Sequence, residues 1–97
     1  MHIISQKKLR DFWTIQPKAE LDLRKWYAFV RRCHWRNSAD IKAVFATASF
    51  FRGNRVVFNI GGNNFRLVVK MVYQSFRVYV RFVGTHAEYD RIDAETI

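Results

Sequence analysis

Residues 84–90, Gly-Thr-His-Ala-Glu-Tyr-Asp, bring together a histidine, a tyrosine and a carboxylate. If this segment is helical, Tyr89 and Asp90 follow His86 by three and four residues and share one face with it, so Asp90 can orient the imidazole. Imidazole changes charge near neutral pH, which suits a general acid or base. The alternative is a histidine that merely lies at an exposed helix start.

Thr85 and Glu88 have the spacing of a capping box. In such a box the threonine side chain accepts a hydrogen bond from the backbone N–H three residues on, while the glutamate side chain accepts one from the backbone of the cap residue. A helix is therefore expected to begin at His86. Its first turn offers free N–H groups and partial positive charge, which favour a phosphate near the histidine.

Three strands are expected just before this helix, at Arg55–Gly61, Phe65–Tyr73 and Phe76–Val83. Side chains of a strand alternate between two faces. One face is apolar or aromatic throughout: Val56, Phe58, Ile60, Phe65, Leu67, Val69, Met71, Tyr73, Phe76, Val78, Val80 and Phe82. The other holds Arg55, Val57, Asn59, Arg66, Val68, Lys70, Val72, Arg77, Tyr79, Arg81 and Val83. The charges of this second set are all positive, so it predicts an anion site with the helix start at its rim.

The whole chain is also basic. Its 97 residues include 17 Lys plus Arg against 8 Asp plus Glu, a formal net charge of +9 with a pI near 10.3. A chain of this length buries roughly 60 to 65% of its unfolded surface, enough for one core, so residues 1–97 are expected to form a single domain. Because the positive excess is concentrated on one predicted sheet face, nucleic acid or another polyanion is favoured as partner over a merely basic protein.

Other function classes find no support in the sequence. Cys33 is the one cysteine and cannot form an internal disulfide, which fits the reducing cytoplasm. The N-terminus lacks the apolar stretch of about 7 to 15 residues of a secretory signal, and no run approaches the roughly 20 apolar residues of a membrane span. The histidines at 2, 34 and 86 are far apart, without metal-ligand spacing. We therefore expect a soluble cytoplasmic protein with no metal, no cofactor and no membrane association.

The N-terminal half is expected to be helical after a short strand at His2–Ser5. Ser5 is placed to cap a helix with apolar positions at 9, 12 and 13, and Pro17 opens a longer second helix. The apolar stripe of that second helix is Ala19, Leu23, Trp26, Tyr27 and Val30. Ser38 or Asp40 can cap a short helical segment through residues 42–45, and residues 46–54 are expected to connect it to the sheet. Turns are expected at 61–64 and near 74–75, because Gly and Asn suit tight hairpins.

Four strings of the chain resemble the HigB branch of the RelE/ParE toxin superfamily. They are Val-Phe-Asn-Ile-Gly-Gly-Asn-Asn-Phe-Arg at 57–66, the segment 84–90, Met-His-Ile-Ile-Ser at the start and Asp-Ile-Lys-Ala-Val-Phe at 40–45. The resemblance implies a small α+β, RelE-like domain: a short N-terminal strand, two helices packed on a mostly antiparallel sheet, and a short C-terminal helix. It also implies a toxin that cleaves mRNA, usually at the ribosome, and that a cognate HigA-type helix-turn-helix antitoxin silences.

RNA cleavage without a metal needs three things. The ribose 2′-hydroxyl must lose a proton, the leaving 5′-oxygen must gain one, and the extra charge on the phosphate must be stabilised. Guanidinium groups suit the last task, so with this resemblance we expect Arg66 and Arg81 to hold the phosphate, with Lys70 next.

The proton-transfer roles fall to the C-terminal helix. We expect His86 to be the general acid or base, Tyr89 to donate a proton or stack on a base, and Asp90 to orient the imidazole. RNA binding away from the cleaved bond is expected from Arg55, Arg77 and Tyr79.

Other readings stay open. The stem of Lys70 can simply lie over Val68 and Val72, Tyr79 can cover neighbouring arginines, and Asp90 can be a first-turn carboxylate. Some members of the superfamily inhibit DNA gyrase without any nuclease activity, so the fold does not determine the function. A ParE-like gyrase poison and a non-catalytic RNA-binding module are the alternatives.

Overall fold

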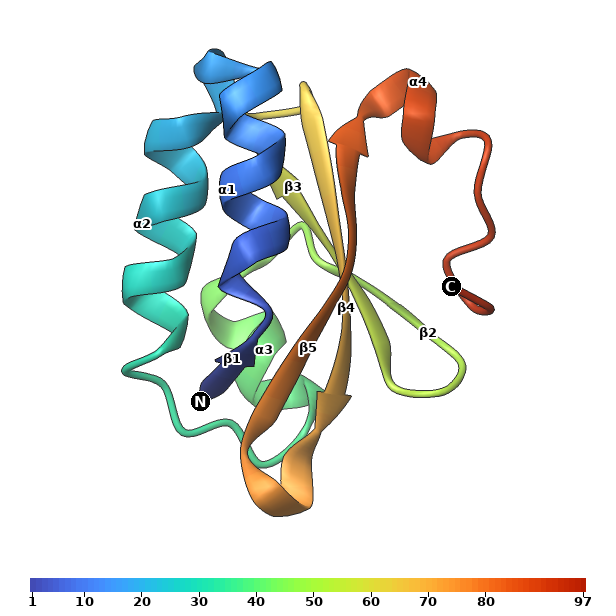
Figure 1. The fold of residues 1–97 in the computed structure, drawn as a ribbon. Coiled ribbons are helices and arrows are strands. Elements are labelled where there is room, and N and C mark those ends of the chain that lie inside the picture. Colours follow the sequence, from blue (N-terminus) through green and yellow to red (C-terminus); the bar gives the residue numbers. More distant parts are fainter.

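The structure is a computed structural model that describes residues 1–97. Its helices are α1 (Gln6–Ile15), α2 (Glu20–Val30), α3 (Ser38–Val44) and α4 (His86–Tyr89), with single 3-10 turns at Pro17–Ala19 and Tyr73–Ser75. Its strands are β1 (His2–Ile4), β2 (Ser49–Phe51), β3 (Arg55–Ile60), β4 (Phe65–Val72) and β5 (Arg77–Thr85). Helices α1 and α2 cover one face of the sheet, which we call the first face; α4 and residues 90–97, the C-terminal segment, lie on the second face (Figure 1).

The sheet has five strands in the order β1-β5-β4-β3-β2. Strand β1 runs parallel to β5, and every other neighbouring pair is antiparallel. This confirms the α+β class and the mostly antiparallel sheet with a short first strand. The expectation that residues 46–54 only connect elements is wrong, because Ser49–Phe51 pairs with Arg55–Val57 as β2. The strand escapes pattern analysis because all three of its residues are exposed, so it has no alternation between buried and exposed positions.

The first face and the helices share one apolar core. Helix α2 places Leu23, Trp26 and Val30 against it, and the Trp26 ring meets the Phe58 ring edge to face with centroids 5.4 Å apart. No charged residue is buried, and Trp26 is the one residue with a buried side-chain polar atom that lacks a hydrogen-bond partner. Pro17 lies in the 3-10 turn that leads into α2, and the Glu20–Arg24 ion pair of 2.7 Å lies outside. The helical stripe predicted for this region is confirmed, with Tyr27 only partly buried.

A β-bulge in β5 changes the predicted faces. Val68 stands opposite Phe82 and Val69 opposite Val80, so Arg81 is an extra residue in the ladder. Beyond it the alternation inverts. Phe82, predicted in the main core, packs instead on the second face, and Val83, predicted on the second face, packs against the main core.

One predicted helix cap is wrong, and another is confirmed in position only. Asn37, rather than Ser38 or Asp40, caps α3, and its side chain accepts a hydrogen bond of 3.1 Å from the backbone N–H of Asp40. Ser5 occupies the cap position of α1, but its side chain makes no capping bond. Both segments are helical because their apolar side chains reach the core, which does not depend on the cap.

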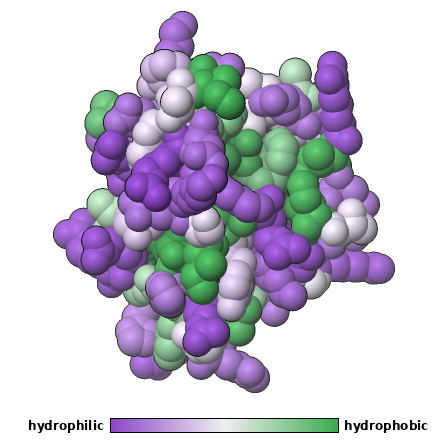
Figure 2. All heavy atoms as spheres, viewed as in Figure 1, coloured by the Kyte–Doolittle hydropathy of each residue, from purple (hydrophilic) through white to green (hydrophobic).

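The C-terminal segment folds back over the second face (Figure 1). Ala94 packs on Val57 and Val68, with the side chains of Phe82, Tyr89, Ile92 and Ile97 around them. Hydrophilic side chains cover much of the side seen in Figure 2, with apolar patches between them. None of the helices combines the length and the apolar character that crossing a bilayer requires.

Candidate functional site

Arg66 lies on the second face, near the start of β4. On β4 it stands between Asn59 of β3 and Gly84 of β5, and it is half-buried. Its Nη1 donates to the carbonyl oxygens of Asn63 at 3.0 Å and Phe65 at 3.2 Å. These bonds hold the guanidinium beside the β3–β4 turn and leave it without a carboxylate partner, so it can bind a phosphate.

His86 lies at the same end of the sheet, as the first residue of α4 directly after β5. The capping box predicted for α4 is confirmed: Thr85 Oγ1 accepts from Glu88 N at 3.2 Å, and Glu88 Oε1 accepts from Thr85 N at 2.8 Å. The backbone N–H of His86 donates to Asn64 O at 3.2 Å, which ties the start of α4 to the turn that also holds Arg66. Neighbouring strands therefore deliver the imidazole and the guanidinium to one region.

Asp90 lies beside the imidazole, as its spacing predicts. Its Oδ2 is 3.6 Å from His86 Nδ1, and both side chains are more than half exposed, at 60% and 56%. At this distance the contact is an ion pair when the imidazole is protonated. Tyr89 is half-buried and packs on the cluster around Val57 and Val68, so its ring position is fixed by the sheet.

Helix α4 adds little charge of its own to this region. It is a single turn of four residues, too short for a substantial dipole, and the Glu88 carboxylate is held at its start. The contribution of the helix N-terminus to the expected phosphate site near His86 is therefore small, and most of the positive charge there comes from side chains.

Lys70, Tyr79 and Arg55 form a second row across the sheet, because Lys70 pairs with the other two on either side. Lys70 is four residues from Arg66 along β4, about 13 Å. The row between them, Val57, Val68 and Phe82, lies under the C-terminal segment. The predicted basic face is thus divided into two parts.

Arg55 is already bonded within the protein. Its Nε and Nη2 donate to the main-chain oxygen of Ile97 at 3.1 and 2.7 Å, and its Nη1 donates to Gly53 O at 2.9 Å. Sequence patterns miss this contact because the C-terminal segment has no periodicity that would place it on the sheet.

The other two predicted arginines lie apart from Arg66. Arg81, the bulge residue, is exposed and lines a surface hollow with Lys8 and Asp11 of α1. Arg77 is exposed at the start of β5, eight residues before Thr85, and so about 26 Å from α4. The structure therefore brings together Arg66, His86, Tyr89 and Asp90, and not Arg77 or Arg81.

Most of the Lys and Arg side chains form no ion pair within the protein. Only Lys7 and Arg24 form ion pairs with carboxylates, while the chain carries 17 Lys plus Arg. Cations without intramolecular partners can neutralise phosphates, which makes a polyanion a suitable partner. The structure contains no group of three or more His, Cys, Asp or Glu side chains arranged to hold a metal ion.

The amino-acid sequence is similar to those of known toxins. A family model described as HigB_toxin, RelE-like toxic component of a toxin-antitoxin system, matches residues 19–92. The chain is 34% identical over 92 residues to the mRNA interferase toxin HigB of Escherichia coli strain K12, a match that covers 93% of this chain and 88% of the relative. The same values relate it to the mRNA interferase HigB of Shigella flexneri. The mRNA interferase HigB of Escherichia coli O6:H1 is 27% identical over 94 residues, 95% of this chain and 91% of the relative. The chain therefore belongs to the HigB family of RelE-like toxins, the toxic components of toxin-antitoxin systems.

Proposed function

We propose that this toxin is an endoribonuclease that cleaves mRNA by attack of a ribose 2′-hydroxyl on the adjacent phosphate, in the cytoplasm and on the translating ribosome. Its relatives bear the name mRNA interferase. The observation that carries the proposal is the arrangement at one end of the sheet, where Arg66 on β4 has no carboxylate partner and the exposed His86 directly follows the neighbouring strand β5.

In this reaction the 2′-oxygen bonds to phosphorus while the bond from phosphorus to the 5′-oxygen breaks. The 2′-hydroxyl gives up a proton and the 5′-oxygen takes one, and His86 serves one of these transfers. Arg66 binds the phosphate oxygens and stabilises the negative charge that grows on them. Asp90 orients the imidazole, and Tyr89 supplies a proton or stacks on a neighbouring base.

The remaining predicted residues serve RNA binding rather than the reacting phosphate. Arg81 and Arg77 are exposed and lack ion-pair partners, so they can contact phosphates along the strand. Lys70 and Tyr79 form a second contact region, separated from Arg66 by the C-terminal segment. Arg55 contributes to RNA binding only to the extent that its bonds to Ile97 leave it free.

The partner that silences the toxin is a HigA-type antitoxin with a helix-turn-helix. Membership of a toxin-antitoxin family supports an antitoxin as partner. The antitoxin and the RNA compete for the same positive charge, whether the antitoxin covers the site or holds the toxin off the ribosome.

Purified protein incubated with mRNA, with and without ribosomes and with excess chelator, tests the reaction. We expect fragments with a 5′-hydroxyl and a 2′,3′-cyclic phosphate or 3′-phosphate, and no cleavage of DNA. The chelator is added only to mRNA without ribosomes, because ribosomes dissociate without Mg²⁺, and it should leave the cleavage of that free mRNA unchanged. Fragments with 5′-phosphates would contradict 2′-hydroxyl attack. RNA that is bound but left intact would favour the non-catalytic module. If the mRNA stays intact and the toxin blocks plasmid supercoiling by DNA gyrase in a parallel assay, the gyrase poison is favoured.

A further inference from the structure

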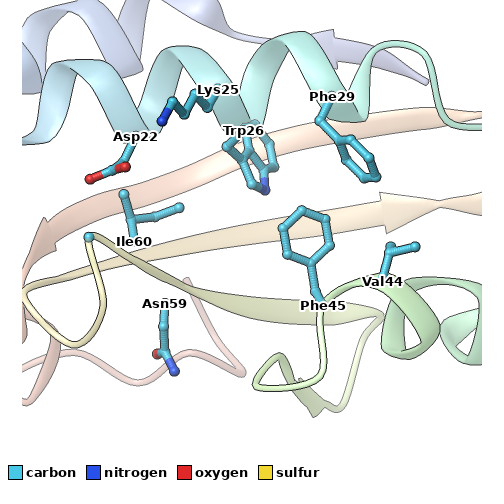
Figure 3. Close-up of a pocket in the computed structure, with 9 residues that line it drawn as sticks. Asp22, Lys25, Trp26, Phe29, Val44, Phe45, Asn59 and Ile60 are labelled. Atoms are coloured by element: carbon cyan, nitrogen blue, oxygen red, sulfur yellow. The ribbon is translucent and has the colours of Figure 1, made fainter.

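A groove separate from the candidate site lies between α2, the end of α3 and strand β3 (Figure 3). Its volume is about 330 Å³, near the lower end of the range for sites that bind ligands or side chains. Two of its walls carry exposed apolar side chains, Phe29 of α2 at 40% and Val44 of α3 at 51%. Exposed apolar surface in a concave site indicates a binding partner more strongly than scattered exposed residues do.

Trp26 supplies a polar group that nothing in the chain satisfies. The residue is only 3% exposed, and its Nε1 is buried without a hydrogen-bond acceptor. Figure 3 shows the indole nitrogen directed from α2 into the groove, between Ile60 and Phe45. Buried donors are nearly always paired, so this one indicates that a ligand brings an acceptor into the groove.

Strand β3 has a free edge along the same groove. Asn54 O accepts from Met71 N at 2.8 Å across the pair of strands, so residues 54, 56, 58 and 60 direct their backbone groups toward β4. Residues 55, 57 and 59 then direct theirs toward β2, but β2 pairs only with Arg55–Val57. The backbone N–H and C=O of Asn59 are therefore open at the groove, while its side chain points away from it (Figure 3).

We propose that this groove binds an extended segment of the antitoxin, which adds to the free edge of β3 in the place that a longer β2 would occupy. This inference rests on the family membership and deepens it by naming a surface for the partner. Backbone bonds to Asn59 set the register, one apolar side chain of the segment enters between Phe29 and Val44, and an acceptor meets Trp26 Nε1.

Charge identifies the kind of segment. The toxin carries +9, and Lys25 lies at the groove without an acidic partner. An apolar residue flanked by an acidic one on the Lys25 side complements this surface. Asp22 lies at the same end of the groove, one helical turn before Lys25 and next to Gly61 (Figure 3), so the acidic residue of the segment must approach Lys25 from the side away from Asp22.

Binding of the purified cognate antitoxin to the full-length toxin tests the proposal by calorimetry. Val44→Asp should weaken binding on the order of 10²-fold, because it places a charge in the apolar part of the groove. Trp26→Phe keeps one aromatic ring but removes the five-membered half of the indole with its N–H, so a loss of about tenfold or more is expected. Ile15→Asp is the matched control, since Ile15 is 77% exposed on α1 and does not line the groove; its affinity should stay within about twofold of wild type.

Hydrogen exchange on the wild-type proteins gives a second readout that does not depend on how the variants fold. The Asn59 amide should exchange slowly in the complex and fast in the free toxin. Unchanged exchange at Asn59, or wild-type affinity of both groove variants, would overturn the proposal. Self-association of the toxin that Val44→Asp abolishes, with antitoxin affinity retained, would overturn it in favour of a second copy of the chain.

The same experiment separates this proposal from the proposed nuclease. If wild-type toxin cuts no RNA but the groove variants lose antitoxin affinity, the nuclease fails and the docking surface stands. If wild-type toxin cuts RNA and the variants bind antitoxin normally, the docking surface alone fails.

Discussion

Arg66 and Lys70 lie on the same face of β4, four residues apart, yet the buried side chain of Val68 separates them beneath the C-terminal segment. Arg66 shares its end of the sheet with His86, whereas Lys70 pairs with Arg55 and Tyr79. One phosphate does not contact both cations, because their positions along the strand are about 13 Å apart, the C-terminal segment lies between them, and the bond to Asn63 O holds the Arg66 guanidinium at the end away from Lys70. The two cations therefore act on different parts of an RNA.

This separation predicts different kinetic effects. Arg66→Ala should lower kcat for mRNA cleavage on the order of 10²-fold, as loss of a charge-stabilising donor does. Arg66→Lys should restore little, because an ammonium cannot make two parallel bonds to phosphate. Lys70→Ala should leave kcat within a few-fold, weaken RNA affinity, and reduce the slope of log affinity against log salt by roughly 0.7 for single-stranded RNA. Equal effects of the two alanine variants on kcat would contradict the division of the face.

The His86–Asp90 pair predicts a graded loss of activity. His86→Ala should lower the cleavage rate by about 10² to 10⁴-fold, the usual contribution of a positioned acid or base. Asp90→Asn should cost roughly tenfold or less, because the contact is 3.6 Å long and exposed to solvent. Both side chains are exposed, so the thermal unfolding midpoint of each variant should match that of wild type. Wild-type cleavage by His86→Ala would move the assignment to Tyr89.

Local sequence patterns predicted the helix and strands that carry the site, but they did not predict the contacts between residues far apart in the sequence. The Thr85–Glu88 box and the alternation in β3 and β4 are local properties, and both are confirmed. The bulge at Arg81 is invisible in the sequence, because a strand with one extra residue has the same composition as a regular one. The packing of the C-terminal segment over Val57 and Val68 could not be predicted either, because residues 90–97 form no regular helix or strand and so have no periodic pattern.

Gly84 predicts a stability effect next to the site. A Cβ at this position would lie 2.5 Å from Phe82 Cζ and 3.2 Å from Glu88 Cβ, so Gly84→Ala must displace the ring or α4. We expect a loss of about 1–3 kcal/mol in the free energy of unfolding, measured by urea denaturation, together with slower cleavage because α4 carries His86. Gly62→Asn is the control: no atom lies within 4 Å of a Cβ there, and Asn tolerates its φ of +68°. Equal stability of Gly84→Ala and wild type would mean that Phe82 moves without cost.

Cys33 should be an unreactive thiol. Burial raises the pKa of the Cys33 thiol, and the nearby N-terminal ammonium and Arg32 only partly oppose this. A raised pKa leaves less thiolate at a given pH, and thiolate is the reactive form. Reaction with a disulfide reagent at pH 8 should be slower in the native toxin than in urea-unfolded toxin. A faster native reaction would indicate an activated cysteine.

Arg55 and Arg77 separate a structural arginine from an RNA-binding one. Arg55 bonds the C-terminal segment through Ile97 O, so Arg55→Ala should lower the free energy of unfolding by about 1.5–3 kcal/mol, the range for hydrogen bonds to charged groups. Arg77 is exposed and forms no ion pair, so Arg77→Ala should stay within about 0.5 kcal/mol of wild type. RNA affinity should follow the opposite order, with the larger loss and the larger fall in salt dependence for Arg77→Ala. If Arg55→Ala instead unfolds like wild type and binds RNA more weakly than Arg77→Ala, the C-terminal segment releases Arg55 to the RNA, and the basic face opens into one surface when RNA binds.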